Sequence, residues 1–295
     1  MSTDRRNPYK PFDRYLIRDF LGKREISSAE LLPAGKSNTN YKLTLSDGAA
    51  YVLRLYSRGN AELETYVMSL VRDLVPVPLE IDRGESWSVF TYLEGDTLES
   101  VPEHSGVAAE ALARISSVVF ESPGWINTDG SVSAFSFGGG SGFITQTLQS
   151  ADARAWLRQE AVEAIHKILK RETHRLNELD AESRLVHGDF NPTNILIHQG
   201  MVSGVLDWEF CHSGTPYMDI GNLLRNTDPE FHDQIKLGLE TGGMSLPGDW
   251  KERAELVDLG SHLEFLTSDR SESFKRRCVA RIHRFIQRFN GGFTV

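Results

Sequence analysis

The sequence predicts an α+β protein, with strand patterns in its first half and helix patterns in its second half. Short apolar runs bounded by turn residues fill the stretch before residue 94, and such runs are typical of strands. Apolar residues at helical spacing are frequent beyond residue 160. At 295 residues, the chain is long enough for one large domain or two lobes with a substantial core.

The first half of the chain predicts helices and strands in alternation. Helices are expected over 9–21 and 61–73, and Pro76 would stop the second one because proline cannot donate to the helix ladder. Strands are expected over 29–32, 41–45, 51–56, 79–81 and 88–92. Glu94-Gly95 then interrupts the pattern. We therefore expect two lobes, formed by residues 1–93 and 94–295.

The second half predicts mainly helices. A long helix is indicated by apolar residues that recur at helical spacing, namely Ile165, Ile168, Leu169, Leu176 and Leu179. The sequence beyond residue 225 predicts about three more helices. Residues 137–142, Phe-Gly-Gly-Gly-Ser-Gly, have a flexible composition. This composition suits either a mobile loop over a site or a plain surface loop.

Charge and cysteine content exclude some classes of partner. The net charge of −9 disfavours nucleic acid and anionic membranes as partners, although it suits a cationic ligand. No apolar run approaches the ~18 residues of a membrane span. The N-terminus lacks the apolar region of a secretory signal. The two cysteines, Cys211 and Cys278, lie far apart and fit a reducing compartment, so we expect a cytoplasmic protein.

The stretch 185–209 carries the most chemical information. Two short strands, 195–197 and 201–206, flank His-Gln-Gly and predict a hairpin. Asn194 precedes the first strand and Asp207 follows the second, so both should emerge at the open end of the hairpin. Asp189 lies on the loop that leads to this end. The spacing allows three oxygen-bearing side chains to converge, but it fits three separate polar loop residues as well.

Converging oxygen donors would suit a hard cation such as Mg²⁺, which prefers oxygen ligands. Asp207 and the side-chain oxygen of Asn194 are candidate ligands, which leaves Asp189 to accept a proton from a hydroxyl group. Phosphoryl transfer requires little more of a base, because positioning and charge neutralisation supply most of its catalysis.

Two motifs resemble a known family. The pattern His-Gly-Asp-x-x-x-x-Asn at 187–194, followed by Leu-Asp-Trp-Glu at 206–209, resembles the aminoglycoside phosphotransferase and choline kinase family, relatives of the protein kinases. The resemblance extends over roughly residues 28–225. It implies a bilobal protein-kinase-like fold, with a small β-rich N-terminal lobe and a larger helical C-terminal lobe.

The resemblance also implies roles for single residues. Asp189 would be the catalytic base, and His187 would support the catalytic loop by hydrogen bonding. Asn194 and Asp207 would be metal ligands, and Glu209 would either reach a second metal ion or face water.

A further aspartate, Asp219, matches a family residue that braces the catalytic loop. The residues alone predict instead that Asp219 is the N-cap of a helix that begins near Ile220. The two roles are compatible.

The resemblance implies that the N-terminal lobe binds the nucleotide. Residues 32–38 would cover the phosphates, with Gly35, Ser37 and Asn38 close to them. Taken alone, this segment predicts only a hairpin turn. Phe90, Tyr92 and Leu93 would line the adenine slot, although their periodicity alone predicts only core and edge-strand residues.

Arg54 occupies the place of the strand lysine of protein kinases. Its guanidinium would bridge a phosphate and a helix carboxylate, that of Glu64 or, in another register, that of Glu62. The alternative is a solvent-facing strand residue.

These expectations combine into one reaction, the Mg²⁺-dependent transfer of the γ-phosphate of ATP or GTP to a hydroxyl group of a small molecule. The acidic net charge would suit a cationic acceptor. The segment 207–218 leaves no room for a long activation loop, which disfavours a protein kinase. A non-catalytic nucleotide-binding module with a kinase-like fold is the alternative, and the presence of Asp189, Asn194 and Asp207 disfavours it. The sequence carries no signal for the identity of the acceptor or for the oligomeric state.

Overall fold

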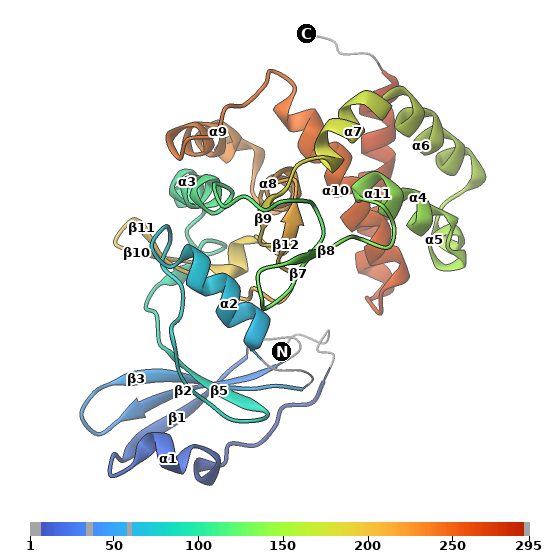
Figure 1. The fold of residues 1–295 in the computed structure, drawn as a ribbon. Coiled ribbons are helices and arrows are strands. Elements are labelled where there is room, and N and C mark those ends of the chain that lie inside the picture. The colour runs from blue at the N-terminus through green and yellow to red at the C-terminus, as the bar shows by residue number, and fades with distance from the viewer. Residues whose placement is uncertain (1–6, 34–37, 58–60, 292–295) are drawn as a thin grey trace.

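The structure is a computed structural model that describes residues 7–33, 38–57 and 61–291. An antiparallel sheet lies at one end of the molecule, and most of the helices lie at the other (Figure 1). This arrangement confirms the predicted α+β class, with a β-rich N-terminal lobe and a helical C-terminal lobe. Gly35 and Ser37 lie outside the described residues.

The N-terminal sheet has five antiparallel strands in the order β1-β2-β3-β5-β4. Their bounds are β1 (Ile26–Leu32), β2 (Thr39–Leu45), β3 (Ala50–Leu55), β4 (Glu80–Arg83) and β5 (Trp87–Thr91). All five predicted strands are confirmed, with small shifts at their ends.

The two faces of this sheet differ in character. Leu43, Leu53 and Val89 are buried with Ile17 in a core beneath one face. Successive side chains of a strand point to opposite faces, so Arg54 on β3 points away from this core. Its cross-strand neighbours are Asn40 on β2 and Ser88 on β5.

The N-terminal helix is shorter than predicted. A 3₁₀ turn, η1 (Arg14–Ile17), continues into α1 (Arg18–Leu21), whereas the sequence pattern predicts a helix over 9–21. The side chain of Asp13 accepts a hydrogen bond from the N–H of Tyr15. This cap starts the helical segment at residue 14.

The helix α2 (Glu62–Val71) confirms the prediction for 61–73 and connects the two lobes. Its residues Val67 and Val71 are buried in the same core as Leu112 and Ile115 of α3 (Ser105–Ile115). This packing fixes the position of Glu64, on the same helix, relative to the C-terminal lobe.

The segment after β5 enters a second, three-stranded sheet with the order β11-β10-β6. It contains β6 (Asp96–Thr97), β10 (Ile195–His198) and β11 (Met201–Val205). The hydroxyl of Ser203 donates to the carbonyl of Glu94 at 2.6 Å, which ties the connecting segment to this sheet. The division of lobes after residue 93 stays a prediction.

The C-terminal lobe contains the remaining elements, which begin with η2 (Pro102–His104) just before α3. Its later helices are α4 (Gly140–Gln149), α5 (Ala151–Trp156), α6 (Gln159–Arg171), α7 (Thr173–Asp180), η3 (Pro192–Asn194), α8 (Tyr217–Arg225), η4 (Pro229–Phe231), α9 (His232–Thr241), α10 (Trp250–Thr267) and α11 (Glu272–Asn290). Its short strands are β7 (Trp125–Ile126), β8 (Val132–Ser133), β9 (Arg184–Val186) and β12 (His212–Gly214).

The C-terminal helices pack in two groups. Residues of α3, α8 and α9 belong to the large core, whereas α4, α6 and α11 form a separate core around Ile165 and Leu263. Helix α10 contributes residues to both cores. The three helices predicted beyond residue 225 are confirmed as α9, α10 and α11. In the part of the chain that the structure describes, no helix has the length and apolarity needed to cross a bilayer.

The prediction of one long helix was wrong in detail. The long helix predicted through Leu179 is divided into α6 and α7 at Glu172. The hydroxyl of Thr173 bonds the carbonyls of Leu169 and Lys170, and such bonding competes with the helical ladder.

The glycine-rich segment 137–142 is partly helical, because α4 begins within it. The carboxylate of Asp180 accepts hydrogen bonds from the backbone N–H and the hydroxyl of Ser141, which satisfies donors of the first turn. A role of this segment as a lid stays untested.

Candidate functional site

The hairpin of β10 and β11 brings Asn194 and Asp207 to the same end. Ile195 pairs with Val205, and the N–H of Leu206 donates to the carbonyl of Asn194 at 2.8 Å. Asp207 follows directly with a φ of 67°, a left-handed conformation that few non-glycine residues adopt. The chain therefore turns sharply at this aspartate, as residues at functional sites often do.

Asp189 is held on both of its carboxylate oxygens. The amide of Asn194 donates to one oxygen at 3.1 Å and to the Asp189 carbonyl at 2.9 Å. The amide of Asn191 donates to the other oxygen at 2.8 Å. Asn191 was missed in the sequence interpretation, although its position two residues after an aspartate is typical of local side-chain bonding. With its nitrogen turned to Asp189, Asn194 keeps its side-chain oxygen for another partner.

His187 is buried beneath the loop that carries Asp189. The N–H of Asp189 donates to Nδ1 of the imidazole at 3.2 Å, so the proton of the ring lies on Nε2, which donates to the carbonyl of Leu206 at 3.0 Å. Burial lowers the pKa of His187, against the nearby carboxylates of Asp189 and Asp207, which raise it. The neutral ring therefore links the loop that carries Asp189 to the end of β11.

Asp219 supports the same loop from α8. Its carboxylate is fully buried and accepts hydrogen bonds from the N–H groups of His187 at 2.6 Å and Gly188 at 2.9 Å. The predicted N-cap role was wrong, because α8 begins at Tyr217 and Pro216 is its N-cap. Asp219 lies in the first turn of α8, and its carboxylate bonds the loop instead of capping the helix.

Gly188 is required by the shape of the loop. Its φ is 81°, and a Cβ atom here would lie 2.3 Å from the carbonyl oxygen of Phe210. Any larger residue would push the loop that carries Asp189 away from the segment after Asp207.

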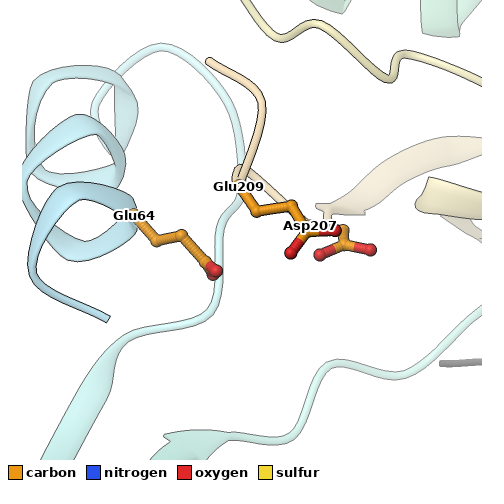
Figure 2. A group of neighbouring side chains, drawn as sticks. All are labelled: Glu64, Asp207 and Glu209. Carbon is orange, nitrogen blue, oxygen red and sulfur yellow. The ribbon is translucent and has the colours of Figure 1, made fainter. Parts of the chain in front are cut away.

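The side chains of Glu64, Asp207 and Glu209 gather in one place (Figure 2). Glu64 comes from α2, and Asp207 and Glu209 follow β11. One oxygen of each lies within 4.8 Å of the other two. Such a group of hard oxygen donors fits Mg²⁺. The sequence interpretation treated Glu64 only as a partner of Arg54, and the approach of α2 to β11 was not visible in the pattern.

Arg54 pairs with Glu64 at 2.6 Å, so the register that involves Glu62 is excluded. Both side chains are largely buried, with 15% and 8% of their areas exposed. Burial lowers the pKa of Arg54, but the carboxylates of Glu64, Asp207 and Glu209 outweigh burial and raise it overall. Burial raises the pKa of Glu64, against the opposite effect of Arg54. Among the described residues, Arg54 thus faces the three acidic groups Glu64, Asp207 and Glu209.

The three residues predicted to line the adenine slot, Phe90, Tyr92 and Leu93, have different neighbours. Phe90 is buried, and the Arg54 guanidinium lies 5.6 Å from its ring centre. The ammonium of Lys42 lies 4.0 Å from the ring centre of Tyr92. Leu93 packs against Gly204 of β11, where an added Cβ would lie 2.8 Å from a Leu93 methyl group.

Asn38 lies directly before β2, and its side-chain oxygen accepts a hydrogen bond from the N–H of Ser57 at 3.2 Å. This bond joins the segment before β2 to the segment after β3.

Comparisons with known proteins concern the family and the fold of the chain. The sequence model described as the phosphotransferase enzyme family matches residues 28–256. The structure of the macrolide 2′-phosphotransferase MphH from Brachybacterium faecium has a TM-score of 0.67 and 13% identity, over 92% of this chain and 98% of that chain.

A second solved structure is that of an aminoglycoside phosphotransferase, APH(4)-Ia, in a ternary complex with AMP-PNP and hygromycin B. It has a TM-score of 0.65 and 18% identity, over 96% of this chain and 100% of that chain. At these identities the two structures show a shared fold. No curated protein matches the chain.

Proposed function

The chain belongs to the phosphotransferase enzyme family, and from that premise we propose that it transfers the γ-phosphate of ATP or GTP to a hydroxyl group of a small molecule. The observation that carries this proposal is the position of Asp189. Its carboxylate is hydrogen-bonded on both oxygens, and its loop is joined through His187 and Asn194 to Leu206, the residue before the clustered carboxylate Asp207. A ternary complex of a similar structure with AMP-PNP and hygromycin B supports a nucleotide donor and a small acceptor.

In the proposed reaction, the oxygen of the acceptor hydroxyl attacks the γ-phosphorus while Asp189 accepts its proton. The bond from the γ-phosphorus to the bridging oxygen of the β-phosphate breaks, and ADP or GDP leaves. Asn191 and Asn194 hold the carboxylate in one orientation, so little reorganisation is needed when the acceptor binds. Asp219 and His187 act through the loop and not on the substrate, since both are buried.

The nucleotide phosphates would lie next to Arg54 and the carboxylates of Asp207 and Glu209. Asn194, Asp207 and Glu209 are the proposed ligands of Mg²⁺, with Glu64 as a further oxygen donor. A bound Mg²⁺ would neutralise charge on the phosphate oxygens. The guanidinium of Arg54 would donate to a phosphate while Glu64 keeps it in place.

We assign the adenine or guanine ring to the segment 90–93 at the end of β5, with Phe90, Tyr92 and Leu93 beside it. Residues 1–93 would form the nucleotide-binding lobe, and residues 94–295 the lobe that carries the base and the acceptor. Gly35, Ser37 and Asn38 are proposed to approach the phosphates.

The test incubates the purified protein with Mg²⁺, ATP or GTP, and a panel of amino alcohols, sugars and aminoglycosides, and measures the release of ADP or GDP. We expect turnover with at least one acceptor, and loss of turnover with intact nucleotide binding in Asp189→Ala. Asp228→Asn, in an exposed turn of the C-terminal lobe, is the matched control. Nucleotide binding without turnover of any acceptor would favour a binding module, and unchanged turnover in Asp189→Ala would exclude this base.

A further inference from the structure

Four rings near the catalytic loop pack against one another and form what we call the aromatic platform, which consists of Trp125, Phe135, Phe137 and His212. Trp125 meets Phe135 at 5.0 Å and an angle of 90°, and His212 at 6.0 Å. Phe135 stacks on Phe137 at 5.0 Å and meets His212 at 5.7 Å. Aromatic pairs at these distances hold each other in fixed orientations.

The platform is open to solvent at its largest ring. Trp125 is 48% exposed, whereas Trp208 and Trp250 are buried. Phe210, two residues from His212, is 46% exposed. Large rings that are fixed in place and left in water are typical of binding surfaces, because a ligand that covers them gains the free energy of burying apolar area.

Backbone pairing joins the platform to the catalytic loop. Strand β7 begins with Trp125, and the preceding residue, Gly124, forms a bridge with Ser213 of β12. In β12, His212 pairs with Val186, the last residue of β9, and the chain continues directly into His187. Strands β7, β8, β9 and β12 accordingly lie together in the middle of the molecule (Figure 1).

A second contact places the platform beside the proposed base. The Phe210 carbonyl accepts a hydrogen bond from Nδ1 of His212 at 3.0 Å, and the same oxygen lies against Gly188. Gly188 is the residue before Asp189. An acceptor that delivers its hydroxyl to Asp189 would therefore have the platform next to it.

The arrangement of the rings indicates which ligand fits. Cages for quaternary ammonium groups need ring faces that surround a space. Here the rings fill the space between them, with neighbouring centres 5.0 to 6.4 Å apart, and form a wall. Burial lowers the pKa of His212, which keeps this ring uncharged at neutral pH. A wall of uncharged rings suits a flat, uncharged partner.

We propose that the aromatic platform binds the acceptor, and that the acceptor carries a flat, uncharged ring close to the hydroxyl that receives the phosphate. This inference rests on the proposed phosphotransfer. Trp125 is its main contact and acts as a specificity-determining residue. Two kinds of molecule offer such a surface, aryl alcohols and the C–H face of sugar rings.

Ligand-observed NMR on the full chain with Mg²⁺ and AMP-PNP tests this directly, with 2-phenylethanol, methyl glucoside and phenyl glucoside as ring probes and glycerol as the open-chain probe. We expect at least one ring probe to bind, and Trp125→Ala to weaken it about tenfold or more. Trp125→Phe should restore most of the affinity. Tyr15→Ala removes an exposed ring, 75% accessible, on the N-terminal helix and should change nothing.

Binding of the aryl or the glucoside probe separates the two sources of the ring. The proposal is overturned if no ring probe binds, or if Trp125→Ala binds the probes as the wild type does while its circular dichroism stays unchanged. Nucleotide binding, measured in the same samples by thermal shift, reports on the proposed function separately. If the wild type does not bind the nucleotide, the proposed phosphotransfer is contradicted. If it binds the nucleotide but no ring probe, only the assignment of the acceptor to the platform is contradicted.

Discussion

Replacement of Asp219 by alanine should destabilise the protein strongly, because this carboxylate is the acceptor for two buried backbone donors. The N–H groups of His187 and Gly188 donate to it at 2.6 and 2.9 Å. A buried donor that loses its acceptor costs about 1–3 kcal/mol, so we expect a loss of roughly 2–6 kcal/mol in the free energy of unfolding. A loss of that size is a large part of the roughly 5–15 kcal/mol of a typical domain.

Urea unfolding followed by circular dichroism measures this loss. Asp219→Asn is the matched control, because the amide has the same shape but offers only one acceptor oxygen in place of two. The loss in Asp219→Asn should therefore be smaller than in Asp219→Ala. The reasoning would be refuted if Asp219→Ala unfolded within about 1 kcal/mol of the wild type, since that is less than one orphaned donor costs.

Three further predictions concern the same loop and its surroundings. Burial raises the pKa of Asp219 to about 7, and the backbone donors oppose this effect. Between the unfolded pKa of about 3.9 and this value, only the folded state keeps the proton, so the stability of the wild type relative to Asp219→Asn should fall as the pH rises from about 4 to 7. A flat difference across this range, in urea titrations, would contradict the assignment. Arg54→Met should weaken nucleotide binding and cost about 3–5 kcal/mol of stability, because Glu64 is left buried without its partner, whereas Arg54→Lys should lose less. Equal stability of the two variants would argue against the ion pair as the cause. Gly188→Ala should cost at least about 1 kcal/mol for the left-handed backbone alone and should lower turnover, because the methyl group would meet the Phe210 carbonyl; a fully active, equally stable variant in the same assays would show that the loop yields.

The end of the β10–β11 hairpin could be predicted because neighbouring residues, His198-Gln199-Gly200, determine its turn. Gln199 and Gly200 both have positive φ values, 50° and 78°, and this is the geometry that a two-residue hairpin turn needs. Once this turn is recognised, antiparallel pairing brings Asn194 and Asp207 to the same end. The strands of the N-terminal sheet could be predicted for the same reason, because short apolar runs alternate with turn residues there.

The cluster of three carboxylates was predicted only in part, because Glu64 comes from an element that is distant in the sequence. Asp207 and Glu209 are neighbours in the sequence, but Glu64 joins them only because α2 packs into the core of the C-terminal lobe. A pattern within α2 shows which side is apolar and not which element covers it. The contact of Asn191 with Asp189 was missed although it is local.

The division between α6 and α7 shows a different limit. Apolar spacing continues across Glu172, so periodicity predicts one helix. The division depends on side-chain bonds, of Thr173 to backbone carbonyls and of Glu172 to Arg171 and Arg175. The start of α4 depends likewise on Asp180, which is distant in sequence.

In the proposed function, Asp207 and its neighbouring carboxylates bind a divalent ion together with a nucleotide. Titration of Mn²⁺ in the presence of AMP-PNP, followed by electron paramagnetic resonance, measures this binding without any acceptor. We predict a site in the wild type and in the control Asp228→Asn, and an affinity lower by at least about tenfold in Asp207→Asn. Equal Mn²⁺ affinity in the wild type and Asp207→Asn would contradict the account.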